Sequence, residues 1–122
     1  GVMNNIYPKK RFHWGLASFT FKSNIYATIY RELFGDISEN ELLTFRLYGT
    51  HSKIVPEKIF NWNEIGNKIE KGGISLSEIF PDQVKNKSFD TFFYVSVFSY
   101  YGGFFFFTDL IKNDLRALEH SF

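Results

Sequence analysis

The sequence predicts a small α+β domain with an antiparallel sheet, a β-hairpin in the C-terminal half and about three packed helices. Three observations carry this prediction. Apolar residues alternate over 42–48, which indicates a strand, and recur with helical spacing over 62–71. A long aromatic segment over 91–108 contains a glycine pair, which is typical of two strands joined by a tight turn.

Length and composition bound the class of protein. The chain has 122 residues, a net charge of +1 and no Cys, so a single domain over 3–122 is expected. Gly1 and Val2 precede Met3 and are interpreted as an expression remnant. The lack of Cys excludes disulfide scaffolds and Cys-ligated metals, and the small net charge argues against general attraction to nucleic acid.

The N-terminal half is predicted to form a strand, a helix and a second strand. Residues 13–21 mix aromatic, small and β-branched side chains, which favours a strand. Ile25 and Ile29 are four residues apart, so we expect a helix that Ser23 caps and Gly35 ends.

The next segment carries competing signals. Ser38–Glu41 matches a capping box, which would begin a helix, but the period-two pattern from Leu42 to Tyr48 favours a strand, with Gly49 in the turn after it. Residues 54–60 contain Pro56 and are predicted to be a loop or an edge strand.

Two further elements precede the aromatic segment. Trp62, Ile65 and Ile69 share one helical face, and the pair Gly72-Gly73 ends that helix. Pro81 divides residues 75–84, which are predicted to form a short helical turn and then a loop.

The aromatic segment and the C-terminal residues complete the prediction. Residues 89–107 are interpreted as a hairpin that turns at Gly102-Gly103 in a type I′ turn, with both faces apolar and therefore covered. A last helix is expected next, with three residues on its inward face: Ile111, Leu115 and Leu118.

A membrane-spanning interpretation of 91–108 is disfavoured. The run lacks charge for 18 residues, which just reaches the length of a spanning helix. Ser96, Ser99 and the glycine pair interrupt it, and no basic cluster stands directly beside it. The N-terminus shows no apolar leader, so we expect a cytoplasmic protein.

The three histidines are the best candidates for chemistry. His13, His51 and His120 show no metal-ligand spacing. A two-histidine acid–base pair of His13 and His51, as in a small RNase-like toxin, is one alternative function. No catalytic residues, cofactor or metal are predicted.

A second alternative is a sheet-based nucleic-acid binder. The run YYGGFFFF (100–107) resembles the aromatic strand of RNA-recognition sheets, but Tyr101 stands where such a strand has a basic residue. Neither glycine pair belongs to a phosphate-binding loop motif.

Binding to a partner protein is the preferred function, because aromatic side chains dominate interface energetics. Between Arg31 and Glu41, one arginine and four carboxylates give a local charge of −3, which favours a basic partner. The predicted partner-binding residues are Glu32, Asp36, Glu39, Glu41, Tyr48, Tyr100 and Tyr101.

In overall profile the chain resembles the immunity proteins of bacterial toxin–immunity systems, including those of contact-dependent growth inhibition. The resemblance is carried by the start Met3–Tyr7, the single small α+β domain and the aromatic segment 92–107. It implies a cytosolic inhibitor that neutralises a cognate toxin by binding it, and a nuclease is the kind of toxin expected. No residue role is transferred, because that family has no common motif.

Overall fold

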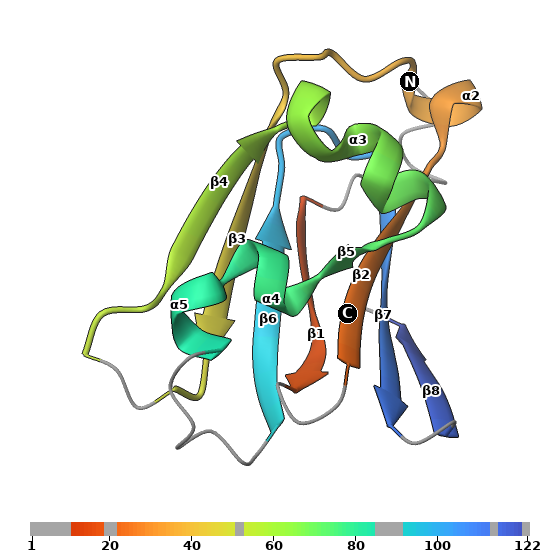
Figure 1. Ribbon diagram of the computed structural model, residues 1–122. Helices are drawn as coiled ribbons and strands as arrows, with labels where there is room; N and C mark the ends of the chain where they lie inside the picture. The colour runs from red at the N-terminus through yellow and green to blue at the C-terminus, as the bar shows by residue number, and fades with distance from the viewer. Residues whose placement is uncertain (1–10, 19–21, 51–52, 85–91, 113–114, 121–122) are drawn as a thin grey trace.

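The computed structural model describes residues 11–18, 22–50, 53–84, 92–112 and 115–120. Two four-stranded antiparallel sheets organise this part of the chain (Figure 1). The first sheet consists, in spatial order, of β1 (Phe12–Ser18), β6 (Phe92–Phe98), β3 (Leu42–Tyr48) and β4 (Glu57–Asn61). The second sheet consists of β5 (Ile74–Ser75), β2 (Lys22–Ile29), β7 (Phe104–Lys112) and β8 (Leu115–His120).

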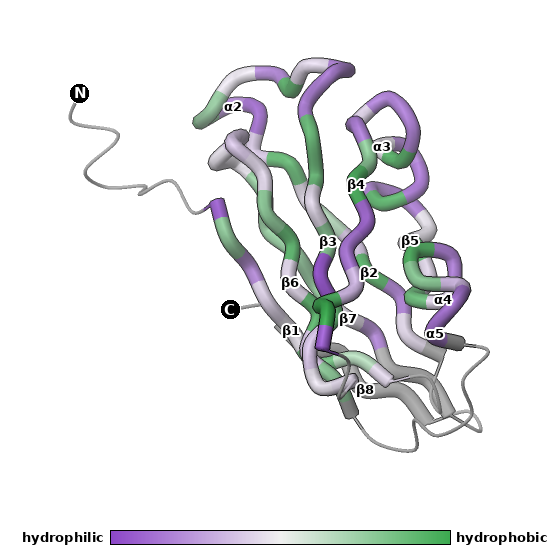
Figure 2. The backbone as a smooth tube through the Cα atoms, turned by 90° about the vertical axis from the view of Figure 1, so that its left-hand side faces the viewer, coloured by the Kyte–Doolittle hydropathy of each residue, from purple (hydrophilic) through white to green (hydrophobic). Residues whose placement is uncertain are grey.

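Helices close one side of the space between the sheets. The described helices are α2 (Arg31–Phe34), α3 (Trp62–Lys71), α4 (Leu76–Ile79) and α5 (Pro81–Val84). The longest, α3, contacts β2, β4 and β5, so it joins an edge of the first sheet to an edge of the second. Figure 2 shows α3, α4 and α5 together on the side away from β1. The α+β class and the antiparallel pairing are therefore confirmed.

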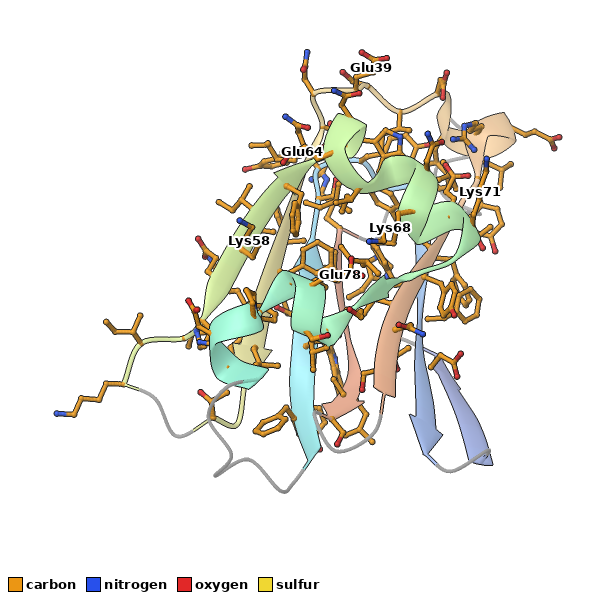
Figure 3. All side chains as sticks on the ribbon, viewed as in Figure 1. Glu39, Lys58, Glu64, Lys68, Lys71 and Glu78 are labelled. Carbon is orange, nitrogen blue, oxygen red and sulfur yellow. The ribbon has the colours of Figure 1, made fainter. Side chains whose placement is uncertain are left out.

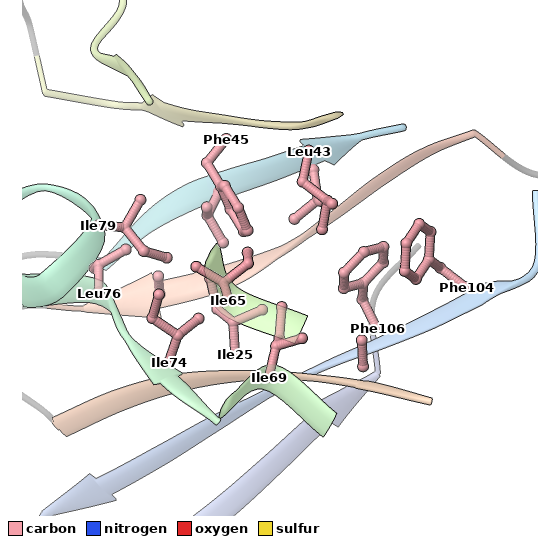
Figure 4. Close-up of a cluster of buried hydrophobic side chains, with 14 of the residues drawn as sticks. Ile25, Leu43, Phe45, Ile65, Ile69, Ile74, Leu76, Ile79, Phe104 and Phe106 are labelled. Atoms are coloured by element: carbon pink, nitrogen blue, oxygen red, sulfur yellow. The ribbon is translucent and has the colours of Figure 1, made fainter. Parts of the chain in front are cut away.

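The core lies between the inner faces of the two sheets and α3 and α4 (Figure 4). Alternate residues of the strands point into it because side chains on a strand have a period of two. The inward residues of β3 and β6 are Leu43, Phe45, Leu47, Phe93, Val95 and Val97, and each is buried. Ile65 and Ile69 of α3 and Phe106 of β7 complete the same cluster.

Several predicted elements are confirmed. The strand over 42–48 is β3, and the helix over 62–71 is α3. Gly72 and Gly73 both donate backbone hydrogen bonds to the Lys68 carbonyl, and Gly73 has a φ of 78°, as a helix-ending glycine requires. The segment with Pro56 leads into β4, which is an edge strand.

The predicted helix from Ser23 is wrong, because residues 22–29 form the strand β2. Ile25 and Ile29 are four residues apart, and an even spacing places both on one face of a strand as well as of a helix. Ala27, between them, is also buried, which completes the period of two. The Ser23 hydroxyl caps no helix. It accepts from the Ser18 amide and donates to the Ser18 carbonyl.

The predicted hairpin over 89–107 is also wrong. Its two strands belong to different sheets: β6 pairs with β1 and β3, whereas β7 pairs with β2 and β8. Neither Gly102 nor Gly103 has the positive φ of a type I′ turn. Gly103 is needed for close packing instead, because a Cβ there would lie 2.7 Å from the Tyr101 ring. The C-terminal-half hairpin of this fold is β7–β8.

The last helix, expected to place Ile111, Leu115 and Leu118 on its inward face, is likewise wrong, because all three residues lie in strands. β7 continues to Lys112, and β8 pairs back on it with Asp109 opposite Leu118. After Pro81, the expected loop is the helical turn α5, in which proline occupies the first position that helices tolerate well. Among the described residues, no helix has the length and apolar character needed to cross a membrane.

Two neighbouring leucines test the register of the first sheet. Leu43 is fully buried, whereas Leu42 is 53% exposed on the other face of β3. We expect Leu43→Ala to lower the free energy of unfolding by about 2–5 kcal/mol and Leu42→Ala by less than about 1 kcal/mol. Urea denaturation measures both. A larger loss for Leu42→Ala than for Leu43→Ala would mean that β3 is shifted by one residue.

Candidate interaction face of the first sheet

The outer side of the first sheet carries a concentration of solvent-exposed aromatic side chains. We call this surface the aromatic face and define it by Phe12, Trp14, Tyr48, Tyr94, Phe98 and Tyr100; Phe98 is half-buried and the other five are exposed. Residues of this set alternate along the strands with buried residues, so the period that fills the core also places these rings outside. Figure 2 shows the helices α3, α4 and α5 beside β4, at the edge of this sheet farthest from β1.

Cross-strand pairing brings the rings together. Phe12 of β1 and Thr44 of β3 both stand opposite Phe98 of β6, and Tyr48 stands opposite Tyr94. The Trp14 and Tyr94 rings meet edge to face, with centroids 5.4 Å apart. Such pairs add to the stability of an aromatic cluster beyond the area they bury. The face is therefore an ordered surface before any partner arrives.

Tyr100 extends this surface beyond the end of β6. Its side chain is 71% exposed, and its ring meets Phe98 edge to face at 5.1 Å. Arg11 approaches from the start of β1, where its Nε donates to the Tyr100 carbonyl at 3.3 Å and its guanidinium lies 6.0 Å from the ring centroid. These contacts hold an exposed tyrosine in a defined place.

One charged pair lies among the aromatic residues. Arg46 of β3 donates from Nε to Glu57 of β4 at 2.8 Å. The hydrogen bond to Glu57, followed by one to Tyr48, raises the pKa of Arg46, so its guanidinium keeps its charge. With Arg11 nearby, this part of the face carries one more positive than negative charge.

Two hollows shape the aromatic face. The first, which we call the Arg46 pocket, has a volume of about 400 Å³ and is lined by Phe12, Thr44, Arg46, Ser96, Phe98 and Tyr100. The second, of about 380 Å³, is shallow and apolar and is lined by Phe12, Trp14, Tyr48 and Tyr94. The face therefore offers both a polar recess and a hydrophobic shelf.

The predicted acidic residues lie at one end of the molecule, beside the aromatic face. We call this part the acidic end and define it by Glu32, Asp36, Glu39 and Glu41. Figure 3 shows Glu39 and Glu64 at that end. The backbone amide of Asn63 donates a hydrogen bond to the Glu39 carbonyl. Asp36 is paired with Arg31 at 3.2 Å, and Arg31 also binds Glu70 at 2.6 Å. Arg31 therefore offsets part of the negative charge that the sequence places here.

Glu41 has a structural role within this end. Its carboxylate accepts hydrogen bonds from the Ser99 hydroxyl and the Tyr101 amide, both at 3.1 Å. It thus connects the loop before β3 to the segment between β6 and β7. Since Tyr100 lies in that segment, Glu41 helps to position an aromatic residue rather than presenting a free charge.

Tyr101, unlike Tyr48 and Tyr100, is not part of the aromatic face. Its ring packs on Phe104, 5.2 Å between centroids, and its hydroxyl donates to the Gly35 carbonyl. Burial raises the pKa of the Tyr101 hydroxyl, which therefore remains a donor at neutral pH. Among the seven predicted residues, Tyr48 and Tyr100 are the two that lie on the aromatic face.

The histidine alternative gains no support from the described geometry. His13 points inward from β1, is 3% exposed and packs edge to face on Phe106 at 4.9 Å. A ring buried there does not reach a substrate in solvent. His51, the other member of the predicted pair, lies outside the described residues. Nor do three or more His, Asp or Glu residues gather as metal ligands anywhere in the described ranges.

Sequence reasoning missed Phe12, Trp14, Arg46, Tyr94 and Phe98. The available signal was alternation along 12–18 and 92–98, where every second residue fills the core and aromatic residues stand between them. Comparison of the chain with protein-family models, with curated proteins and with solved structures found no match.

Glu41 and Glu39 both belong to the acidic end, but we expect their removal to affect the stability of the fold differently. Glu41→Ala leaves the Tyr101 amide and the buried Ser99 hydroxyl without their charged acceptor, and we expect a loss of about 1–3 kcal/mol in unfolding free energy. Glu39→Ala removes an exposed side chain, so its change should stay within about 0.5 kcal/mol. Chemical denaturation compares the two. Equal effects would contradict the structural role of Glu41.

Proposed function

We propose that this chain is a binding protein that holds a partner protein on the aromatic face. The single observation that carries the proposal is the ordered group of six aromatic side chains on one solvent-facing sheet surface. Water-exposed apolar patches of this kind mark interaction sites, because covering them with a partner removes apolar area from water. Tyrosine, tryptophan and arginine are also the residues that most often dominate binding energy.

Within that class we propose an immunity-type inhibitor that neutralises a bacterial toxin in the cytoplasm. The support is the resemblance in sequence profile and the acidic end beside the aromatic face. A toxin that cuts nucleic acid is basic where it binds its substrate, and acidic residues speed its encounter. The aromatic rings would then hold the complex that forms.

A second candidate is a single-strand nucleic-acid binder, which the exposed rings and the two arginines favour. Two observations weigh against it. The Trp14 and Tyr94 rings already pack edge to face on each other. Arg11, Arg46 and Glu57 leave this face with an excess of only one positive charge, whereas a nucleic-acid strand carries a phosphate at every nucleotide. Steeply salt-dependent binding of single-stranded RNA, with no protein partner, would favour this candidate instead.

The aromatic face can be tested with the product of each reading frame next to this chain's gene. Co-expression and size-exclusion chromatography should give a stoichiometric complex with one of them. We expect Trp14→Ala and Tyr94→Ala each to weaken that complex by roughly 30-fold or more in calorimetry. Tyr30→Ala is the matched control, because Tyr30 is similarly exposed but follows the second sheet.

Two results would contradict this interface. One is a complex that both face variants form as tightly as the parent. The other is equal weakening by Tyr30→Ala, which would indicate a general loss of stability. Melting temperatures of all the variants, measured without partner, distinguish misfolding from a loss of contacts.

The acidic end is tested by association kinetics. Glu32→Lys with Glu39→Lys reverses two exposed charges without disturbing Glu41. We expect association with the partner to slow several-fold and to depend less on salt, while dissociation changes little. Stopped-flow measurements at two salt concentrations decide the matter. Unchanged rates at both would leave these glutamates as solvated surface residues.

A further inference from the structure

We infer that the Arg46 pocket binds a partner residue that combines an aromatic ring with a carboxylate. A chain that ends in Phe or Tyr has this chemistry. The inference rests on the proposed function, since it names the group that a bound partner inserts into the aromatic face. The walls, floor and charge of the pocket all come from described residues.

The walls of the pocket suit a ring. Phe12 and Phe98 are cross-strand neighbours, and Tyr100 meets Phe98 edge to face at 5.1 Å. An inserted ring would contact these three side chains and exclude water from them. The volume of about 400 Å³ is within the range of pockets that hold small ligands and is sufficient for one aromatic residue.

The floor of the pocket suits a carboxylate. Arg46 supplies a guanidinium that uses its Nε for Glu57, and Thr44 and Ser96 line the same recess with hydroxyl groups. Ser96 is buried to 1% exposure, so its hydroxyl lies at the base rather than at the rim. A guanidinium beside hydroxyl donors is a common arrangement for binding a planar anion.

The local charge supports an acidic rather than a basic ligand. Arg46 lies in the pocket and Arg11 at its edge beside Tyr100, whereas Glu57 is the carboxylate paired with Arg46. The excess of one positive charge attracts an anion. Glu57 also competes for the same guanidinium, so its removal should strengthen binding of an acid.

The test uses N-acetyl-L-phenylalanine as the probe and N-acetyl-L-phenylalaninamide as its uncharged match. In NMR titrations of the whole chain, we expect saturable shifts at the backbone amides of Thr44, Ser96 and Phe98. The acid should bind about tenfold more tightly than the amide, which corresponds to one charged hydrogen-bonded contact.

Three variants identify the groups responsible. Arg46→Gln should reduce affinity for the acid to that for the amide, and Phe98→Ala should weaken both probes alike. Glu57→Gln should increase affinity for the acid several-fold and leave the amide unchanged. Because Arg46 and Glu57 are exposed, neither substitution is expected to unfold the chain.

The inference is overturned if the acid produces no saturable shifts at the pocket, or if acid and amide bind equally. It is also overturned if adenosine 5′-monophosphate binds the same residues more tightly than the acid, which would indicate a nucleotide site. The probes need no protein partner. If the acid binds the pocket but no protein forms a complex with the chain, the result counts against the proposed function alone. If a protein forms a complex but the acid does not bind, the result counts against this inference alone.

Discussion

The pairing of β6 with both β1 and β3 is the constraint on which the rest of the structure depends. β6 is a central strand, and its register assigns Phe93, Val95 and Val97 to the core and Tyr94, Ser96 and Phe98 to the opposite face of the sheet. A shift of one residue would exchange the two sets. The same register therefore builds the hydrophobic core and the aromatic face, and neither exists without the other.

Local sequence patterns correctly predict the elements that depend only on residues near one another in the chain. The alternation over 42–48 and the helical face over 62–71 correspond to β3 and α3. Prediction fails where a pattern fits two structures: the four-residue spacing of Ile25 and Ile29 fits one face of a helix and one face of a strand. The pairing of β6 and β7 with strands of different sheets depends on partners far along the chain, and no local feature of 89–107 indicates it.

The same difference between local and long-range information applies to the candidate site. The sequence predicts Tyr48 and Tyr100 as exposed tyrosines, and the structure places both on the aromatic face. It also predicts that Glu41 and Tyr101 meet a partner, but their hydrogen bonds connect parts of the chain some 60 positions apart. Whether a tyrosine or glutamate serves packing or recognition depends on those distant partners. Composition alone therefore indicates that aromatic contacts matter without indicating which rings make them.

The two tryptophans give the molecule two separate optical reporters. Trp62 is buried at the start of α3 against Phe104, whereas Trp14 is 40% exposed beside Tyr94 on the aromatic face. Their fluorescence differs accordingly, since a buried indole emits at shorter wavelength and is shielded from dissolved quenchers. The emission of Trp62 follows unfolding, and the accessibility of Trp14 to iodide follows the covering of the aromatic face. One unlabelled sample therefore reports on the integrity of the fold and on occupancy of its surface at the same time.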